Sequence, residues 1–267
     1  MSKRLLITMP GERSNKELYV AALDRLGLLA HCDFVHQNNT KLYGKYPDDY
    51  ARKWYRKSKW KELAEQVYYD SQDRLRRDWA PKPFTHTFYN YEQEGWMWDK
   101  EQNGYTKNDI RFVKAILRGM QEANPTLKRS MYMAPRITNG PIKRRDYDHV
   151  IQMSPATRMM DWVWFGLYPT TDYLNRPMTK DIMDTLRQRV RQGYALMEAN
   201  RLPVIPSFFL HYSMSVKDVV TYHKTAIEAL PSDCDQINIW TDLRDQAPNQ
   251  IEHLEAVAPM LLERLEK

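Results

Sequence analysis

Short apolar runs alternate with longer amphipathic stretches along the whole chain. The apolar runs are rich in β-branched and aromatic residues, which favours strands near residues 4–9, 31–37, 84–91, 129–134, 161–168, 202–210 and 236–240. Between them, hydrophobic residues recur three or four positions apart, which predicts helices near residues 14–26, 49–79, 110–120, 146–153, 179–200, 216–230 and 251–265. Strand and helix therefore alternate about seven times.

This alternation predicts an α/β protein in which a parallel sheet is covered by helices. We expect a distorted (β/α) TIM-like barrel of about seven parallel strands, formed by residues 1–267 as a single domain. An openly wound sheet is the alternative, but neither a GxGxxG nor a GxxxxGK[ST] motif is present to indicate a nucleotide crevice. We also expect a helix break near Ser58, an irregular strand at the prolines of 202–210, and a kink or boundary at Pro259.

The stretch Phe84–Trp98, FTHTFYNYEQEGWMW, ends a predicted strand with two acids set among aromatic residues. Because strand side chains alternate between faces, Glu92 and Glu94 share one face. A carboxyl group can protonate the leaving oxygen of a glycosidic bond, and aromatic planes hold the apolar faces of sugars. The candidate aromatic contacts are Tyr89, Tyr91 and Trp96. The simpler interpretation is a strand end with solvated acids and core aromatics.

Polar and aromatic residues also follow other predicted strands. These residues are Tyr168, His211, Tyr212, Trp240 and Asp242. In a barrel all strand ends emerge at one face, where the active sites of this fold lie, so the sequence favours a closed arrangement over an open sheet. We predict that the five residues belong to the same site as the acids, with Asp242 as a candidate second carboxylate.

Four strand ends resemble those of hyaluronidase-type glycoside hydrolases. The segment Asn90–Trp96 is similar to the acidic strand end of that family, which has the form Asp-x-Glu followed by a second acid and Trp. The motifs Leu167-Tyr168-Pro169, Pro203-Val204 and Ile239-Trp240 are similar to three further strand ends of the family, in the same order.

The resemblance implies a distorted barrel, with Glu92 as the general acid/base. In the family, the substrate's own N-acetyl group assists cleavage, and the residue two before the Glu orients that group. Asn90 stands at this position in place of Asp. An amide can hydrogen-bond an acetamido group but lacks the negative charge that stabilises a developing cation. Glu94 or Asp242 could then supply a second carboxylate.

Composition and charge add two further observations. The chain holds 17 Tyr and 8 Trp against 7 Phe, an excess that favours a long binding groove for a carbohydrate polymer. The net charge is +6, and residues 41–61 combine eight Lys or Arg with six Tyr or Trp. That segment could bind an acidic polysaccharide or, as a less favoured alternative, single-stranded nucleic acid. It could equally form an amphipathic helix with solvated cations and inward rings.

The remaining residue types indicate no cofactor and no metal. Cys32 and Cys234 are far apart, so no zinc motif is present, although one disulfide between them is geometrically allowed. The apolar run of the first residues stops by Pro10, too early for a secretory signal, and no run reaches the length of a membrane span. We therefore expect a soluble chain that is cytoplasmic at synthesis and makes no membrane contact.

These observations lead to a functional prediction with one close alternative. We predict a glycoside hydrolase that cleaves a polysaccharide, with acidic and N-acetylated polymers as candidate substrates and Glu92 as its general acid/base. The alternative is a non-catalytic carbohydrate-binding barrel, in which Asn90 marks lost chemistry.

Overall fold

The computed structural model describes residues 3–39, 60–90, 107–131, 158–167, 177–199, 201, 203–211, 213–243 and 247–267. The strands in these ranges are β1 Arg4–Thr8, β2 Cys32–Asn39, β3 Phe84–Asn90, β4 Lys128–Met131, β5 Val163–Leu167, β6 Val204–Phe209 and β7 Gln236–Trp240. The helices are α1 Arg13–Arg25, the short 3₁₀-helix η1 Leu29–His31, α3 Trp60–Arg77, α4 Lys107–Ala123, α7 Lys180–Ala199, α8 Val216–Ala229 and α9 Ala247–Glu266.

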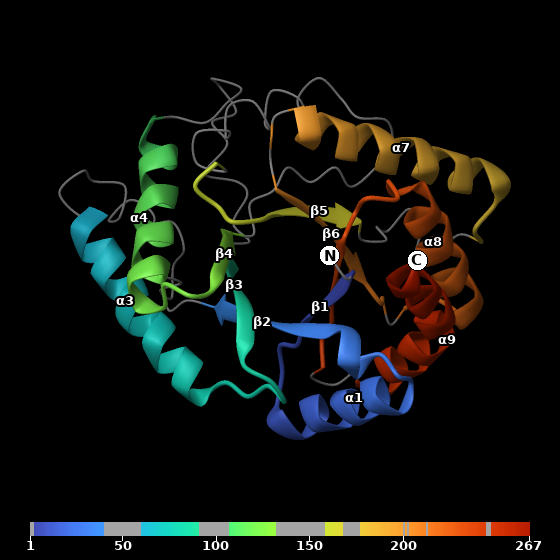
Figure 1. The fold of residues 1–267 in the computed structure, drawn as a ribbon, viewed down its shortest axis with the longest axis horizontal. Helices are drawn as coiled ribbons and strands as arrows, with labels where there is room; N and C mark the ends of the chain where they lie inside the picture. Colours follow the sequence, from blue (N-terminus) through green and yellow to red (C-terminus); the bar gives the residue numbers. More distant parts are fainter. Residues whose placement is uncertain are drawn as a thin grey trace.

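The seven strands form one parallel sheet in the order β4-β3-β2-β1-β7-β6-β5. The sheet curls into a nearly closed barrel with the helices outside it (Figure 1). This confirms the predicted fold class and the position of every predicted strand to within a few residues. Parallel pairing requires each strand to return through a crossover, and the helical stretches between the strands supply these crossovers.

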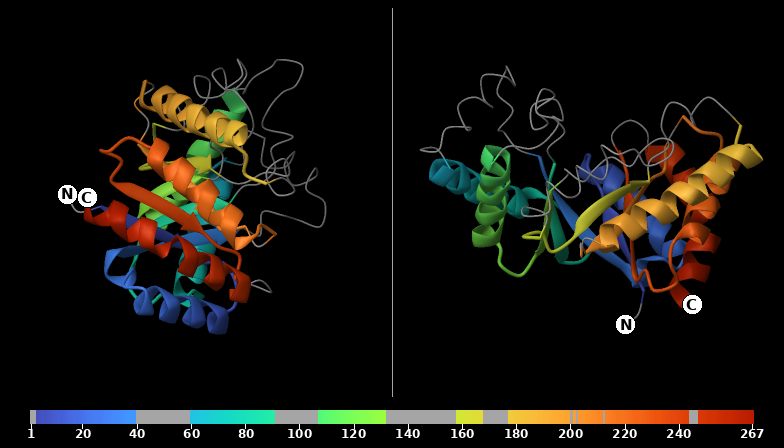
Figure 2. Two further views of the ribbon diagram at one scale, coloured as in Figure 1. Left: turned by 90° about the vertical axis from the view of Figure 1, so that its right-hand side faces the viewer. Right: turned by 90° about the horizontal axis from the view of Figure 1, so that it is seen from above.

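The helices lie in two groups around the barrel (Figures 1 and 2). Helices α3 and α4 pack against each other beside β2 to β4, whereas α7, α8, α9 and α1 form a continuous row around the other strands. No helix in the described ranges combines the length and apolar character needed to cross a bilayer.

Alternation along the strands separates two apolar cores. The inner faces of the strands fill the barrel with a small cluster: Leu6, Val35, Phe88, Trp162, Trp164 and Ile205. The outer faces contribute to a much larger core against the helices, in which residues such as Ile7, Phe34 and Ile239 are fully or almost fully buried. Successive residues of a strand point alternately into the barrel interior, called the lumen below, and outward to the core beneath the helices.

The two edge strands, β4 and β5, meet at a seam that is bridged by the two residues just before β5: Nε1 of Trp162 donates to the carbonyl of Lys128 at 3.3 Å, and Asp161 bonds to Arg129. The backbone N–H of Asp161 donates to the carbonyl of Arg129 at 2.8 Å. The carboxylate of Asp161 accepts from the backbone N–H of Arg129 at 2.8 Å and from its Nε at 2.9 Å. Partial burial opposes ionisation of Asp161, but these bonds outweigh it and hold the pKa of the carboxyl below its ordinary value.

We expect Asp161→Ala to lower the free energy of unfolding by about 1–2 kcal/mol, because it removes the acceptor of two hydrogen bonds at the seam. Urea denaturation followed by circular dichroism measures this change. Arg118→Ala serves as the control: within the described ranges Arg118 makes an exposed ion pair with Glu122 on α4, and its loss should cost less than about 0.5 kcal/mol. Equal effects of the two substitutions would argue against a closing role for Asp161.

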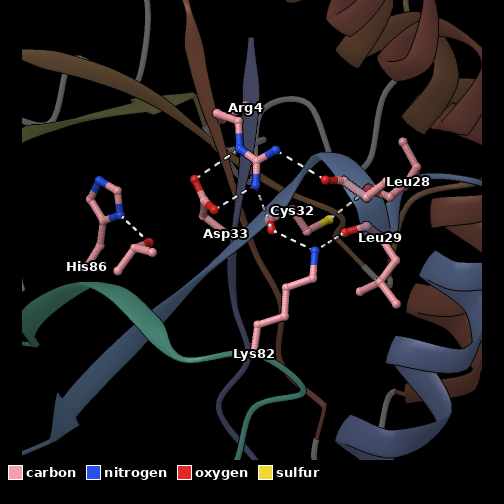
Figure 3. A network of polar contacts seen from close by, with 9 residues as sticks. Arg4, Leu28, Leu29, Cys32, Asp33, Lys82 and His86 are labelled. Carbon is pink, nitrogen blue, oxygen red and sulfur yellow. Dashed lines mark hydrogen bonds and ion pairs between the residues drawn. The ribbon is translucent and has the colours of Figure 1, made fainter. Parts of the chain in front are cut away.

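A polar network joins the starts of three adjacent strands, β1, β2 and β3 (Figure 3). The guanidinium of Arg4 donates to both carboxylate oxygens of Asp33, at 2.7 and 3.1 Å, and to the carbonyls of Ala30 and Cys32. Nζ of Lys82 donates to the carbonyls of Leu29 and Cys32. The network ties the η1–β2 turn to β1 and to the start of β3, so its position and bonding indicate a structural role.

The two cysteines are free and buried, so the disulfide that the sequence allowed is not formed. Cys32 donates its thiol hydrogen to the carbonyl of Leu28 at 3.2 Å. Burial raises the pKa of the Cys32 thiol to about 12, which keeps it protonated and unreactive at neutral pH.

Two local expectations about proline are resolved by the structure. The predicted boundary at Pro259 is wrong, because α9 continues through this residue to Glu266. Pro206 lies inside β6, whose pairing with β7 begins only at Ser207. Proline has no N–H to donate to a ladder, which accounts for this late start. The predicted break near Ser58 and the predicted helix at 146–153 lie outside the described residues.

Candidate active site at the barrel mouth

The carboxyl ends of the parallel strands meet at one rim of the barrel, called the mouth below. Thr8 of β1 pairs with Trp240 of β7, and Trp240 pairs with Phe209 of β6, so these three residues mark the same level of the wall. Thr8 and Phe209 lie an even number of residues from Leu6 and Ile205, which point into the barrel, so all three residues of this level belong to the inner face.

An aromatic wall lies at the ends of β6 and β7. The ring of Trp240 lies 4.7 Å from that of Phe209, and the ring of Phe209 lies 5.1 Å from that of His211. Phe209 is buried, whereas Trp240 and His211 are half-buried. Trp240 thus rests on a fixed ring and keeps part of its surface accessible, as a stacking platform for a flat ligand requires.

A buried polar layer supports this wall from below. The hydroxyl of Thr8 donates to Oδ1 of Asn238 at 3.0 Å, and Nδ2 of Asn238 donates to Oγ of Ser207 at 2.6 Å. All three side chains are fully buried. Asn238 lies two residues before Trp240, and Ser207 two residues before Phe209. Residues two apart on a strand share a face, so this spacing in the sequence could have placed Asn238 and Ser207 below the aromatic wall.

His211 is held as a neutral ring. Its Nδ1 accepts from the backbone N–H of Ser213 at 3.2 Å, so the neutral ring carries its proton on Nε2. Burial, and then the positive charge that His253 would carry, lower the pKa of His211. At neutral pH the residue is therefore suited to hydrogen bonding with sugar hydroxyls and is not a fixed cation.

The end of β7 is anchored by a residue that the sequence analysis missed. The backbone N–H of Asp242 donates to Oε1 of Gln250 at 2.8 Å, while Nε2 of Gln250 donates to the carbonyl of Leu210 at 3.2 Å. Gln250 is fully buried at the first turn of α9 and so connects the ends of β6 and β7. This anchoring fixes the backbone of Asp242, whose side chain is half-buried.

The structure describes the candidate acidic strand as far as Asn90. This residue ends β3 and forms the last pair with Asn39 of β2. In the sheet order β3 and β7 are separated by β2 and β1, so in a seven-stranded barrel their ends stand on roughly opposite sides of the mouth. Six predicted site residues lie outside the described residues: Tyr91, Glu92, Glu94, Trp96, Tyr168 and Tyr212.

Tyr89 occupies a different environment from the predicted substrate contact. Its side chain is fully buried in the large core on the helix side of the sheet, next in sequence to Phe88 of the barrel interior. Neighbouring strand residues point to opposite faces, so Tyr89 points away from the lumen. A soluble sugar cannot reach a fully buried ring, and Tyr89 is removed from the proposed contacts.

Two further expectations concern metals and the basic segment 41–61. Within the described ranges, no group of three or more His, Cys, Asp or Glu side chains is arranged to hold a metal ion. Of the basic segment, only Trp60 and Lys61 are described, at the start of α3. The guanidinium of Arg111 on α4 lies 5.2 Å from the centre of the Trp60 ring, so this ring takes part in the α3–α4 contact.

Comparison with models of protein families and with curated proteins finds no match. Among solved structures, a broad-specificity endoglucanase of glycoside hydrolase family 5 from Clostridium longisporum is similar at a TM-score of 0.51 and 10% identity, over 98% of this chain and 82% of that chain. The cellulose synthase subunit Z of Clostridioides difficile reaches a TM-score of 0.46 at 11% identity, over 95% of this chain and 87% of its own. At such identities, the similarity to the endoglucanase shows a shared barrel fold.

Proposed function

We propose that this protein is a glycoside hydrolase that binds a polysaccharide across the barrel mouth. One observation carries the proposal: β3 ends at Asn90, so in the sequence Glu92 comes two residues after the carboxyl end of a barrel strand. β3 itself stands opposite β7, which ends at Trp240 and is followed by Asp242. Acids at strand ends of such a barrel are where this fold performs chemistry. The fold shared with an endoglucanase is consistent with this proposal.

In the proposed mechanism Glu92 protonates the glycosidic oxygen and then activates water as a base. Glu94 and Asp242 are the candidates for a second carboxylate, and Asn90 is the candidate for orienting an N-acetyl group, as the resemblance to hyaluronidase-type enzymes implies. Asn90 can donate and accept hydrogen bonds but carries no charge. Tyr91, Trp96, Tyr168 and Tyr212 are proposed to line the sugar subsites together with Trp240 and His211.

Trp240 is proposed to be the stacking platform for a sugar ring. We expect Trp240→Ala to raise KM about tenfold while kcat changes less, because stacking contributes about 0.5–1.5 kcal/mol. Initial rates over a range of polysaccharide concentrations measure both constants. Trp240→Phe is the matched control, since it keeps an aromatic plane on Phe209 and should retain most of the affinity. A loss of kcat alone in Trp240→Ala would contradict the platform role.

The second candidate function is carbohydrate binding without turnover, which the Asn in place of Asp at position 90 favours. Release of reducing ends from neutral, acidic and N-acetylated polysaccharides separates the two candidates. Turnover of any of them supports the hydrolase, and its substrate range names the sugar class. Saturable binding of a polysaccharide with no release of reducing ends would establish the binding protein instead.

A further inference from the structure

A hollow lies outside the barrel wall, between the start of α1 and the end of α3. Its volume is about 280 Å³, and its lining includes Gly11 and Lys16 at the start of α1, His36 of β2, and Arg74, Arg77 and Asp78 at the end of α3. His36 lies on the outer face of β2, the face that also carries Phe34 of the helix-side core. We call this hollow the α1–α3 pocket.

The charge of the α1–α3 pocket is positive, because its lining holds three cations and one carboxylate. Lys16 is buried and forms an ion pair with Asp78. Arg77 pairs with Asp73 one turn earlier on α3. Among the residues that the structure describes, no carboxylate lies within ion-pair distance of the Arg74 guanidinium, which leaves the pocket with uncompensated positive charge.

His36 adds a buried polar atom that points to a missing partner. Its side chain is 1% exposed, its Nδ1 lies 3.3 Å from Oγ1 of Thr87, and its Nε2 lies 3.9 Å from Asp78. Within the described ranges this Nε2 has no hydrogen-bond partner. Buried polar atoms are nearly always paired, so an unpaired nitrogen in the wall of a polar pocket indicates a site for a ligand atom.

The start of α1 supplies a third feature. Gly11 adopts a φ of 120°, a backbone conformation that other residues rarely adopt, and so turns the chain sharply between β1 and α1. Glu12 is the N-cap, and its side chain makes no capping hydrogen bond. The positive end of the α1 dipole therefore adjoins the pocket between Gly11 and Lys16.

We propose that the α1–α3 pocket binds a tetrahedral oxyanion, a phosphate or sulfate group, either free or carried by a sugar. Arg74, which no described carboxylate neutralises, favours an anion over a neutral ligand. Its guanidinium, the unpaired Nε2 of His36 and the uncapped start of α1 together offer more donors than the two oxygens of a carboxylate can accept, so a group with three or four acceptor oxygens fits better. The pocket lies at the level of the mouth, because residues 9–11 directly follow β1, but His36 points to the helix side of the wall. No described residue of the proposed hydrolase site lines the pocket. The proposal is therefore independent of the hydrolase function.

Isothermal titration calorimetry of the full chain tests the proposal with four probes: inorganic phosphate, sulfate, a hexose 6-phosphate and glucuronate. We expect phosphate or the sugar phosphate to bind with a Kd that is roughly millimolar or tighter. Arg74→Gln should weaken this binding about tenfold or more, because it removes the uncompensated charge. Tighter binding of the hexose phosphate than of phosphate would identify a phosphorylated sugar as the ligand, and the reverse order a free anion.

Arg76→Gln is the matched control, because Arg76 lies on the same helix, is exposed and does not line the pocket. It changes the net charge equally and should alter affinity less than about twofold. Equal losses in the two variants, no saturable binding of phosphate, sulfate or the hexose phosphate, or a preference for glucuronate would each overturn the proposal. Circular dichroism of both variants confirms that they fold as the wild type does.

Discussion

Replacing Glu92 by Gln is expected to reduce polysaccharide hydrolysis by about a hundredfold or more. The amide keeps the size and most hydrogen bonds of the carboxyl group but can neither donate the proton to the leaving oxygen nor accept one from water. Reducing ends released per minute by the wild type and by Glu92→Gln, on the substrate that the wild type cleaves best, measure the loss.

Glu65→Gln makes a suitable control, since Glu65 is exposed on α3 and should leave the rate unchanged. Glu94→Gln and Asp242→Asn then identify the second carboxylate. A large loss of hydrolysis in one of these two variants and not in the other identifies the carboxylate that works with Glu92. If both retain activity while Glu92→Gln does not, substrate assistance through Asn90 gains support. Full activity of Glu92→Gln would refute the assignment of the acid.

The barrel could be predicted from the sequence because its signals are local. Each strand is a short apolar run, and each helix repeats its hydrophobic residues over three or four turns, as in α7 and α8. The strand ends at Asn90 and Trp240 also fell where these runs stop. Of the two alternatives at Pro259, the boundary is wrong and the kink stays a prediction. Helix propensity is a weak preference that packing overrides, and α9 buries Leu254, Ala258 and Leu261 on both sides of the proline.

The prediction that Tyr89 contacts a sugar is wrong, although period-two alternation along β3 indicates where its side chain points. Period-two alternation placed Glu92 and Glu94 on one face of the strand, and it places Tyr89 on the other. Within β3, Tyr89 lies on the opposite face from Phe88, whose side chain fills the barrel interior. An aromatic residue close to two acids suggested a sugar contact. Its position in the strand, however, points the Tyr89 ring to the helix-side core, and the ring lies there.

Contacts between distant residues could not be predicted. The bond from Thr8 to Asn238 joins residues 230 positions apart, and the ion pair of Lys16 with Asp78 joins residues 62 apart. The seam depends on the register in which β4 meets β5, which hydrophobic periodicity leaves undetermined. The polar layer under the mouth and the α1–α3 pocket both arise from such contacts, so they became visible only when the strands were placed side by side.

The fold should be markedly less stable in mild acid. Burial lowers the pKa of His36, His86 and His223 to about 4, because the interior disfavours the charged ring; Arg74 and Lys128 add to this effect at His36 and His86 respectively. In the unfolded chain these rings titrate near the ordinary value of 6.5. Between pH 6.5 and about 4 the unfolded chain thus binds more protons, so the free energy of unfolding falls as the pH falls.

Each such ring contributes on the order of 3 kcal/mol that is present above pH 6.5 and lost by pH 4. Domains are typically stable by only about 5–15 kcal/mol, so we expect cooperative unfolding above pH 4. Midpoints of urea unfolding measured at half-unit steps from pH 7 to pH 4 should show this decline. His223→Phe removes one titrating ring, whose Nδ1 bonds the carbonyl of Val219. The variant should take up as much as one proton fewer on unfolding, so its free energy of unfolding should fall less steeply with pH.

Leu18→Gln is the control for this measurement. Leu18 is 58% exposed on α1 and has no titrating group, so its replacement should leave the pH profile unchanged. The wild-type chain must lose stability more steeply than His223→Phe between pH 6.5 and 4 if buried neutral rings cause the effect. Parallel profiles for the wild type and His223→Phe would assign acid sensitivity to carboxylates such as Asp161, whose lowered pKa acts in the same direction but mainly below pH 4.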